Sequence, residues 1–186
     1  MTAEIYRLKI VLQYSKPVIW RRVLVKSDIK LSKLSEIILT VMGWSGGHLH
    51  GFRVKEQYYL DLDNFEDRPT ALDERETRLC DVVGCGKYFI YDYDFGDGWQ
   101  HSIRVEAVLK PEWGVKYPVC TAGAMACPPD DIGGMGGYED FLKALKNPKS
   151  KKNKELIEWH GGEDFDPAEL NLEEINEALH LPKESQ

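Results

Sequence analysis

Residues Lys87–Leu109 read KYFIYDYDFGDGWQHSIRVEAVL, and this stretch decides the fold. On both sides of Gly96-Asp97-Gly98, aromatic and β-branched residues alternate with polar ones, which is the period-two pattern of half-buried strands. Gly98 stands where a type I turn followed by a bulge requires a left-handed residue. The stretch therefore predicts two long antiparallel strands that form one hairpin.

The loop length of this hairpin determines which residues face each other. A three-residue loop places Phe95 opposite Trp99 and collects aromatic and aliphatic side chains on one face. A two-residue loop would place Asp92 opposite His101, an attractive acid–imidazole pair, but it would mix the two faces. We favour the three-residue register because it separates polar from apolar side chains better, and it gives up the direct Asp92–His101 pair.

The chain before this stretch predicts a second hairpin and a helix. Residues 6–14 and 19–26 alternate apolar and polar side chains on either side of a Ser-Lys-Pro turn. Apolar residues then recur with helical spacing up to Met42, between Ser32 as a candidate N-cap and Gly43 as a helix terminator. We expect this helix to cover one face of the sheet.

The remaining segments predict shorter elements. Residues 48–54 form a short strand with His48 and His50 on one face, and residues 61–77 are charged and predict a surface excursion. After Pro111 the chain is irregular as far as the glycine run at residues 133–137. Three helical segments follow, at residues 138–145, at residues 156–160 and after the capping residue Asn171.

The composition fits one domain spanning residues 1–186. Hydrophobic residues make up 42% and charged residues 30%, which is enough apolar material for a core and excludes global disorder. The net charge of -7, from 24 Lys+Arg and 31 Asp+Glu, disfavours extended nucleic-acid binding and anionic membranes. No stretch approaches the ~18 apolar residues of a membrane span, and no signal-peptide pattern opens the chain, so we expect a cytoplasmic protein.

The loop end of the Lys87–Leu109 hairpin carries the first candidate site. Its carboxylates, indole and imidazole suit a divalent cation, a cationic ligand or acid–base chemistry, although aspartates also form turns without any ligand. The proline- and glycine-rich loop from Cys120 to Tyr138 lacks a phosphate-binding lysine and is typical of the wall of a cleft or of a protein contact. The candidate binding residues are Asp92, Asp94, Asp97, Trp99, His101, Asp130, Asp131 and Tyr138.

A metal site is the second interpretation, with a divalent metal as its cofactor. Imidazoles and thiolates from distant segments would have to converge on one ion, and the cysteine spacings fit no CxxC knuckle. The alternative is that the histidines pack or form hydrogen bonds and that the cysteines are free thiols. The candidate ligands are His48, His50, His101, Cys120 and Cys127.

Several of these motifs resemble the plasmid pRiA4b ORF-3-like family, whose members are often described as transposon passenger or resolvase-like proteins. The resemblance covers nearly the whole chain and rests on Trp20-Arg21-Arg22, Met42-Gly43-Trp44, residues 48–52, residues 93–101, residues 127–131 and residues 164–167. It implies an α+β domain with a mainly antiparallel sheet, helices packed on it, and a β-grasp-like opening hairpin and helix. One departure is Asp130, where the family pattern leads us to expect glutamate.

Three functional hypotheses follow. The leading one is a cytoplasmic binding or interaction domain, associated through the resemblance with mobile elements, whose partner is a protein or small molecule. The second is a metal-dependent hydrolase or nucleic-acid-processing enzyme that uses the histidines and aspartates, although no assembled catalytic constellation is recognisable. The third is a DNA-binding accessory protein that uses the lysines between Lys143 and Lys154.

Overall fold

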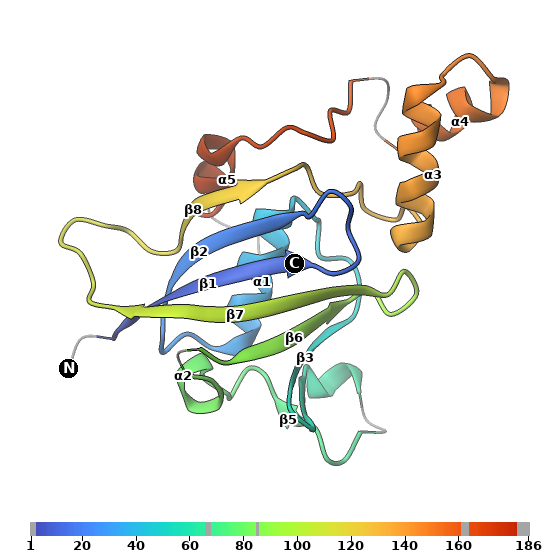
Figure 1. The fold of residues 1–186 in the computed structure, drawn as a ribbon. Helices are drawn as coiled ribbons and strands as arrows, with labels where there is room; N and C mark the ends of the chain where they lie inside the picture. Colours follow the sequence, from blue (N-terminus) through green and yellow to red (C-terminus); the bar gives the residue numbers. More distant parts are fainter. Residues whose placement is uncertain (1–2, 66–67, 85, 161–163, 182–186) are drawn as a thin grey trace.

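One eight-stranded sheet, with the strand order β5-β4-β3-β6-β7-β1-β2-β8, organises the molecule (Figure 1). The computed structural model describes residues 3–65, 68–84, 86–160 and 164–181. All neighbouring strands pair antiparallel except β4 and β5, which pair parallel. The strands are β1 Ile5–Leu12, β2 Trp20–Lys26, β3 His50–Val54, β4 Gln57–Leu60, β5 Leu72–Asp73, β6 Tyr88–Tyr93, β7 Trp99–Leu109 and β8 Val119–Ala124.

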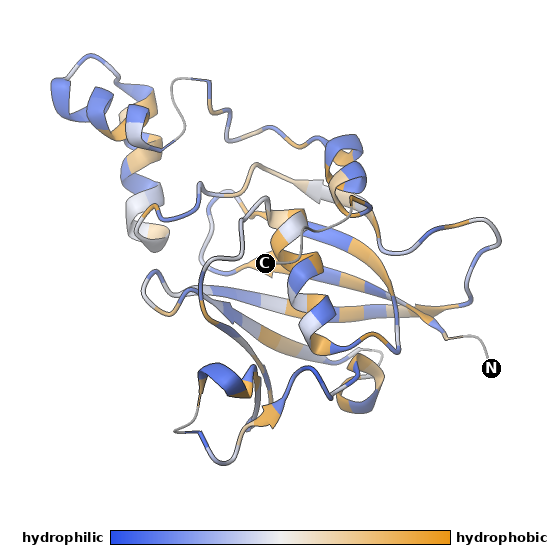
Figure 2. Ribbon diagram, turned by 180° about the vertical axis from the view of Figure 1, so that it is seen from behind, coloured by the Kyte–Doolittle hydropathy of each residue, from blue (hydrophilic) through white to orange (hydrophobic). Residues whose placement is uncertain are grey.

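Helix α1 (Leu31–Met42) covers one face of this sheet, as the sequence predicts, and Figure 2 shows it lying across the strands. The alternating residues of β1 and β2 that point toward α1 are buried, among them Leu8, Ile10 and Val23. Burial of these side chains against the apolar stripe of α1 supplies the main hydrophobic core, since each fully buried aliphatic side chain contributes about 1.5–3 kcal/mol. The opening hairpin and helix are confirmed.

The other helices lie around the sheet. Helix α2 (Leu79–Val82) follows the 3-10 turn at Leu62–Asn64 and strand β5, while α5 (Leu172–Ala178) lies beside β8. Helices α3 (Gly134–Lys146) and α4 (Lys151–Trp159) pack against each other at one end of the sheet (Figure 1). Every helix in the described part of the chain is too short or too polar to span a membrane.

The predicted hairpin exists, but its register is different. Tyr93 pairs with Trp99, and Tyr91 pairs with His101, so the loop has five residues, Asp94–Gly98, rather than three. The reason is that Asp94 already leaves the strand, with a left-handed backbone (φ 49°). Because the shift is two residues, each side chain keeps its predicted face, and Gly98 keeps its predicted left-handed conformation (φ 70°).

Two helix starts also differ from the prediction. Lys30, and not Ser32, occupies the N-cap of α1, and its side chain makes no capping hydrogen bond. The glycine run is not a loop, because α3 already begins at Gly134. The predicted terminator Gly43 and the predicted cap Asn171 are confirmed: Gly43 is left-handed (φ 76°), and the Asn171 side chain accepts hydrogen bonds from the amides of Glu173 and Glu174.

Candidate functional site

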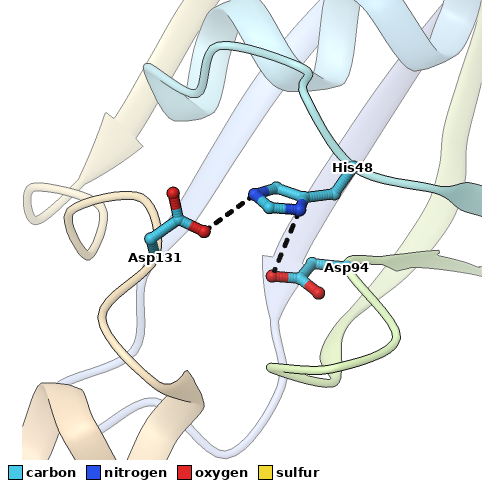
Figure 3. A group of neighbouring side chains, drawn as sticks. All are labelled: His48, Asp94 and Asp131. Atoms are coloured by element: carbon cyan, nitrogen blue, oxygen red, sulfur yellow. Dashed lines mark ion pairs between the residues drawn. The ribbon is translucent and has the colours of Figure 1, made fainter.

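Three loops meet where the β6–β7 hairpin ends, and together they form the candidate site. The first loop, residues 44–49, leads from α1 into β3 and carries His48. The second is the Asp94–Gly98 hairpin loop, and the third, residues 125–133, runs from β8 into α3. These segments are distant in sequence, and Figure 3 shows one side chain from each of them, with the His48 ring lying between the carboxylates of Asp94 and Asp131.

The imidazole of His48 lies between two carboxylates. Its Nε2 is 2.8 Å from Oδ1 of Asp131, and its Nδ1 is 3.9 Å from Oδ2 of Asp94 (Figure 3). One potential ligand atom from each of the three residues lies within 4.8 Å of the others. We call these residues the His–Asp cluster; within the described part of the chain, no other group of His, Cys, Asp and Glu side chains is gathered closely enough to share a metal ion.

Asp94 is fixed by its own hairpin. Its backbone amide donates to the carbonyl of Leu49 (2.9 Å), and its Oδ1 accepts hydrogen bonds from the amides of Gly96 (2.9 Å) and Asp97 (3.3 Å). Its carbonyl also accepts from the amide of Gly98 (2.6 Å). One carboxylate oxygen therefore shapes the loop, and the other, Oδ2, faces His48 in a side chain that is only 13% exposed.

Asp130 and Asp131 are adjacent in sequence but differ in role. Oδ2 of Asp130 accepts hydrogen bonds from the hydroxyl (2.7 Å) and the amide (3.2 Å) of Ser45, which ties the third loop to the first. The side chain of Asp131 is 71% exposed and reaches His48 from the solvent side. Asp130 therefore anchors the loop, whereas Asp131 belongs to the cluster.

The glycines at the start of α3 bring the third loop against the hairpin. The amide of Gly133 donates to Oδ2 of Asp97 (3.0 Å). A Cβ atom at Gly134 would lie 2.4 Å from the carbonyl oxygen of Asp97, and one at Gly137 would lie 1.8 Å from that of Ile132, so neither position has room for a side chain. The glycine run thus permits a close approach of the backbone, and Asp97 supports the loop without joining the His–Asp cluster.

An aromatic layer lies beneath the cluster. The Trp44 ring stacks on Tyr93 (5.2 Å between centroids) and contacts Trp99 (5.4 Å) and the edge of His101 (5.3 Å). Its indole Nε1 donates to the carbonyl of Pro128 (2.9 Å), so the same residue also holds the third loop. The three loops therefore rest on a layer of buried aromatic rings.

Tyr93 connects the aromatic layer to the cluster. Its ring meets the edge of the His48 ring at 5.7 Å, and the residue is fully buried. Burial raises the pKa of Tyr93 to about 12, and the carboxylates of Asp130 and Asp94 add to this rise, which places the phenol near both of them. Backbone amides of Gly46 and His48 act against this rise by hydrogen bonding to the phenol, whereas Oδ1 of Asp130 is buried with no hydrogen-bond partner among the described residues.

The other predicted metal ligands do not join His48. Nε2 of His50 lies 3.0 Å from the buried carboxylate of Glu74, on the far side of the aromatic layer. His101 is fully buried, and burial lowers its pKa to about 4. Burial raises the pKa of the Cys120 thiol, and it raises that of Cys127 to about 11, so both thiols stay protonated.

Three predicted binding residues are too enclosed or too distant to touch the same ligand as the cluster. Trp99 and Tyr138 are buried and support the site from beneath. Asp92 points to the face of the sheet opposite α1, where it accepts a hydrogen bond from Gln100 (2.8 Å). The loops at this end of the sheet thus gather Asp94, Asp97, Asp130 and Asp131. Strand β6, which carries Asp92, contributes no residue to the His–Asp cluster.

Sequence reasoning missed several residues that shape the site. Trp44 has a sequence signal, because it directly follows the helix-ending Gly43 and large aromatic side chains at such positions often pack back onto the core. Tyr93 was assigned only to the apolar face of its strand. Glu74 has no signal at all, since it lies within the charged segment that predicts a surface excursion, yet it is buried beside His50.

The cluster combines one imidazole nitrogen with two carboxylate oxygens. This mixed donor set is typical of sites for divalent ions such as Mn²⁺, Fe²⁺ or Zn²⁺, whereas a purely thiolate set would select other metals. Three protein ligands also leave coordination positions for water or a further ligand. The geometry is therefore suited to holding a cation that remains accessible from solvent.

Comparison with known proteins agrees with the architecture. A crystal structure of MM3350, a protein of unknown function from Methanosarcina mazei, has a TM-score of 0.84 and 33% sequence identity, and the match covers 94% of this chain and 97% of that one. The uncharacterized protein y4hQ of Sinorhizobium fredii is 38% identical over 182 residues, which are 96% of this chain and 92% of that protein. The family model for plasmid pRiA4b ORF-3-like proteins matches residues 4–174. The chain thus belongs to the plasmid pRiA4b ORF-3-like family, and it has an α+β fold with a mainly antiparallel sheet.

Proposed function

We propose that this protein is a binding domain whose ligand site is the His–Asp cluster, and that the cluster holds a divalent metal ion. The observation that carries this proposal is the convergence of one nitrogen and two oxygen donors, from three separate loops, within 4.8 Å. The ion sits at the rim of the site, since Asp131 is exposed and His48 is partly exposed. In this proposal the metal presents its open coordination positions to a second ligand that carries oxygen donors.

A buried polar atom under the cluster supports the proposal independently. A buried carboxylate oxygen without a hydrogen-bond partner costs about 1–3 kcal/mol. Oδ1 of Asp130 is in this situation among the described residues, and it lies next to the loops of the cluster. Water in the coordination sphere of a bound metal would supply a hydrogen bond to this atom.

The same cluster carries the enzymatic alternative. A metal with open positions can lower the pKa of a bound water and thereby generate a nucleophile, which is how metal-dependent hydrolases act. The ligands in that case are His48, Asp94 and Asp131, in place of a set that includes His50 and His101. Metal binding is the first requirement of either function, so one experiment addresses both.

We propose in addition that the protein is cytoplasmic. Cys80, Cys120 and Cys127 are free, and free thiols persist in a reducing compartment.

The test is calorimetric titration of the metal-free protein with Mn²⁺ and Zn²⁺, together with thermal melting in the presence of each ion. We expect one ion per chain in the wild type and a rise in melting temperature, because an ion at about 100 times its Kd stabilises the folded state by about 2.7 kcal/mol. Asp131→Asn should abolish both effects while leaving the melting temperature of the metal-free protein unchanged, since this side chain is exposed.

Asp92→Asn is the matched control, because it removes the same charge from the opposite face of the sheet. This variant should bind the ions as the wild type does. If the wild type binds neither ion, or if Asp131→Asn and Asp92→Asn weaken binding equally, the His–Asp cluster is not the metal site.

A further inference from the structure

The face of the sheet opposite α1 carries a concentration of positive charge. No helix in the described part of the chain lies across this face at β1, β2 and β7 (Figure 1). Lys9 is the direct cross-strand partner of Arg22 on one side and of Arg104 on the other. We call these three residues the basic row.

This arrangement is unfavourable for the isolated protein. Like charges placed directly opposite each other on neighbouring strands destabilise a sheet, by roughly 0.2–1 kcal/mol for each pair. Glu106, at the bulge of β7, relieves part of the repulsion: it accepts hydrogen bonds from Nε (2.7 Å) and the terminal nitrogen (3.1 Å) of Arg22, and Arg7 lies 3.3 Å away. The Arg22 hydrogen bond holds the pKa of Glu106 below its usual range, so this carboxyl group is ionised at neutral pH.

One carboxylate does not balance the three cations whose charges act on it, Arg22, Arg7 and Lys9. Among the described residues, Arg104 has neither an ion pair nor a hydrogen bond. Lys9 lies over the ring of Trp20 at 5.0 Å, and Arg22 lies over the same ring at 5.2 Å. The uncovered face therefore keeps a net positive charge on a protein whose overall charge is -7.

The basic row continues into a groove. Tyr88 is the cross-strand partner of Arg104, and its side chain is 70% exposed. It also lines a groove of about 950 Å³, in which the cations Arg53, Lys55 and Lys87 outnumber the carboxylates Glu56 and Asp81. An exposed aromatic ring therefore stands between the cations of the row and those of the groove.

We infer that this face binds single-stranded nucleic acid, which lies across β2, β1 and β7 and enters the groove at Tyr88. Proteins that bind single strands combine a positively charged track for the phosphates with aromatic side chains on which bases stack. The basic row with Arg53 and Lys87 provides the track, and the exposed ring of Tyr88 provides the aromatic contact. An acidic protein would match the charge but would leave the exposed aromatic ring of Tyr88 without a planar partner.

The inference is independent of the His–Asp cluster, and it differs from DNA binding by the lysines between Lys143 and Lys154. Those lysines lie on α3, α4 and their connection, where Lys143 is paired with Asp140 and Lys151 lies near Glu155. They follow one another in the sequence, whereas the basic row is assembled only by strand pairing. The negative overall charge of the protein repels nucleic acid at long range, whereas the positive charge on the uncovered face governs the contact itself.

The test is fluorescence anisotropy with a labelled oligothymidylate of about 20 nucleotides, longer than one site of ~4–16 nucleotides. Binding should weaken steeply with salt between about 50 and 200 mM. The double variant Lys9→Gln, Arg104→Gln should weaken binding roughly tenfold and reduce the salt slope by about 1.4, since each phosphate contact to a single strand contributes about 0.7.

The matched control is Lys151→Gln, Lys152→Gln, which removes two charges from α4 and should leave the affinity unchanged. Thermal melting confirms that the Lys9/Arg104 variant is folded, and a second variant, Tyr88→Ala, tests the stacking contribution at an exposed position. The inference is overturned if the wild type does not bind at low salt, if the α4 control loses as much affinity as the row variant, or if polyglutamate competes as well as the oligonucleotide does.

Discussion

The His–Asp cluster and the basic row carry opposite charges, and the chain assembles them in opposite ways. The cluster joins three loops, each held by its own hydrogen bonds, and it rests on the aromatic layer around Trp44. The row is fixed by the register of β1 with β2 and β7 and needs no loop. The cluster therefore depends on packing at one end of the sheet, whereas the row depends on strand pairing alone. A substitution that disrupts one of these two regions should therefore leave the other intact.

Removal of Trp44 should have the largest effect. Trp44→Ala deletes a buried ring that stacks on Tyr93 and holds Pro128, so we expect a loss of about 3–5 kcal/mol in the free energy of unfolding. Metal binding should disappear with it, while oligonucleotide binding persists wherever the variant remains folded. Urea unfolding gives the stability, and titrations below the transition give the two affinities. Parallel loss of both affinities in the folded variant would show that the two regions are not independent.

His101 provides a pH test of the aromatic layer. Burial lowers its pKa from 6.5 to about 4. Between these two pH values the His101 imidazole is protonated in the unfolded chain but stays neutral in the folded protein. The contribution of neutral His101 to the free energy of unfolding is therefore fully present above pH 6.5 and is lost as the pH falls toward about 4. At 1.36 kcal/mol for each pKa unit, the loss is about 3 kcal/mol.

The measurement compares urea unfolding of the wild type and His101→Phe at several pH values from 7.5 to 4. The variant should lose less stability than the wild type over this range. His180→Gln, at the end of α5, serves as the control and should follow the wild type. An equal pH dependence in the wild type and His101→Phe would mean that His101 is accessible to protons in the folded protein.

Neutralising Arg104 should have the smallest effect on stability, with the opposite sign. Arg104→Gln removes a cation that lies directly opposite Lys9, so stability should rise by a few tenths of a kcal/mol at low salt. The gain should shrink at high salt, because screening already weakens the repulsion. Thermal melting at two salt concentrations measures this difference. A loss of stability, or a gain that does not depend on salt, would indicate that Arg104 makes a stabilising contact.

The parts of the fold that could be predicted are those with local signals. The period-two patterns identified β1, β2, β6 and β7, and Gly43 and Asn171 marked a helix end and a helix start correctly. The register of the β6–β7 hairpin was missed by two residues, because the turn begins at Asp94, whose side chain bonds the loop amides. Nothing in the sequence distinguishes this aspartate from one that continues the strand.

The candidate site could be predicted only in part. His48, Asp94 and Asp131 were each singled out as candidates, but which of the candidate residues lie together could not be predicted, because this depends on contacts between distant loops. The glycine run was predicted as part of an irregular loop, whereas Gly134 and Gly137 are needed for close backbone contacts that no local pattern reveals. The basic row was hidden for the same reason, since Lys9, Arg22 and Arg104 become neighbours only through strand pairing.

Anomalous diffraction from crystals grown with Mn²⁺ tests the central claim most directly. The account predicts one anomalous peak bonded to a nitrogen of His48 and to carboxylate oxygens of Asp94 and Asp131, and no such peak in crystals of Asp131→Asn. A peak at another group of side chains, or no peak in wild-type crystals at saturating Mn²⁺, would contradict it.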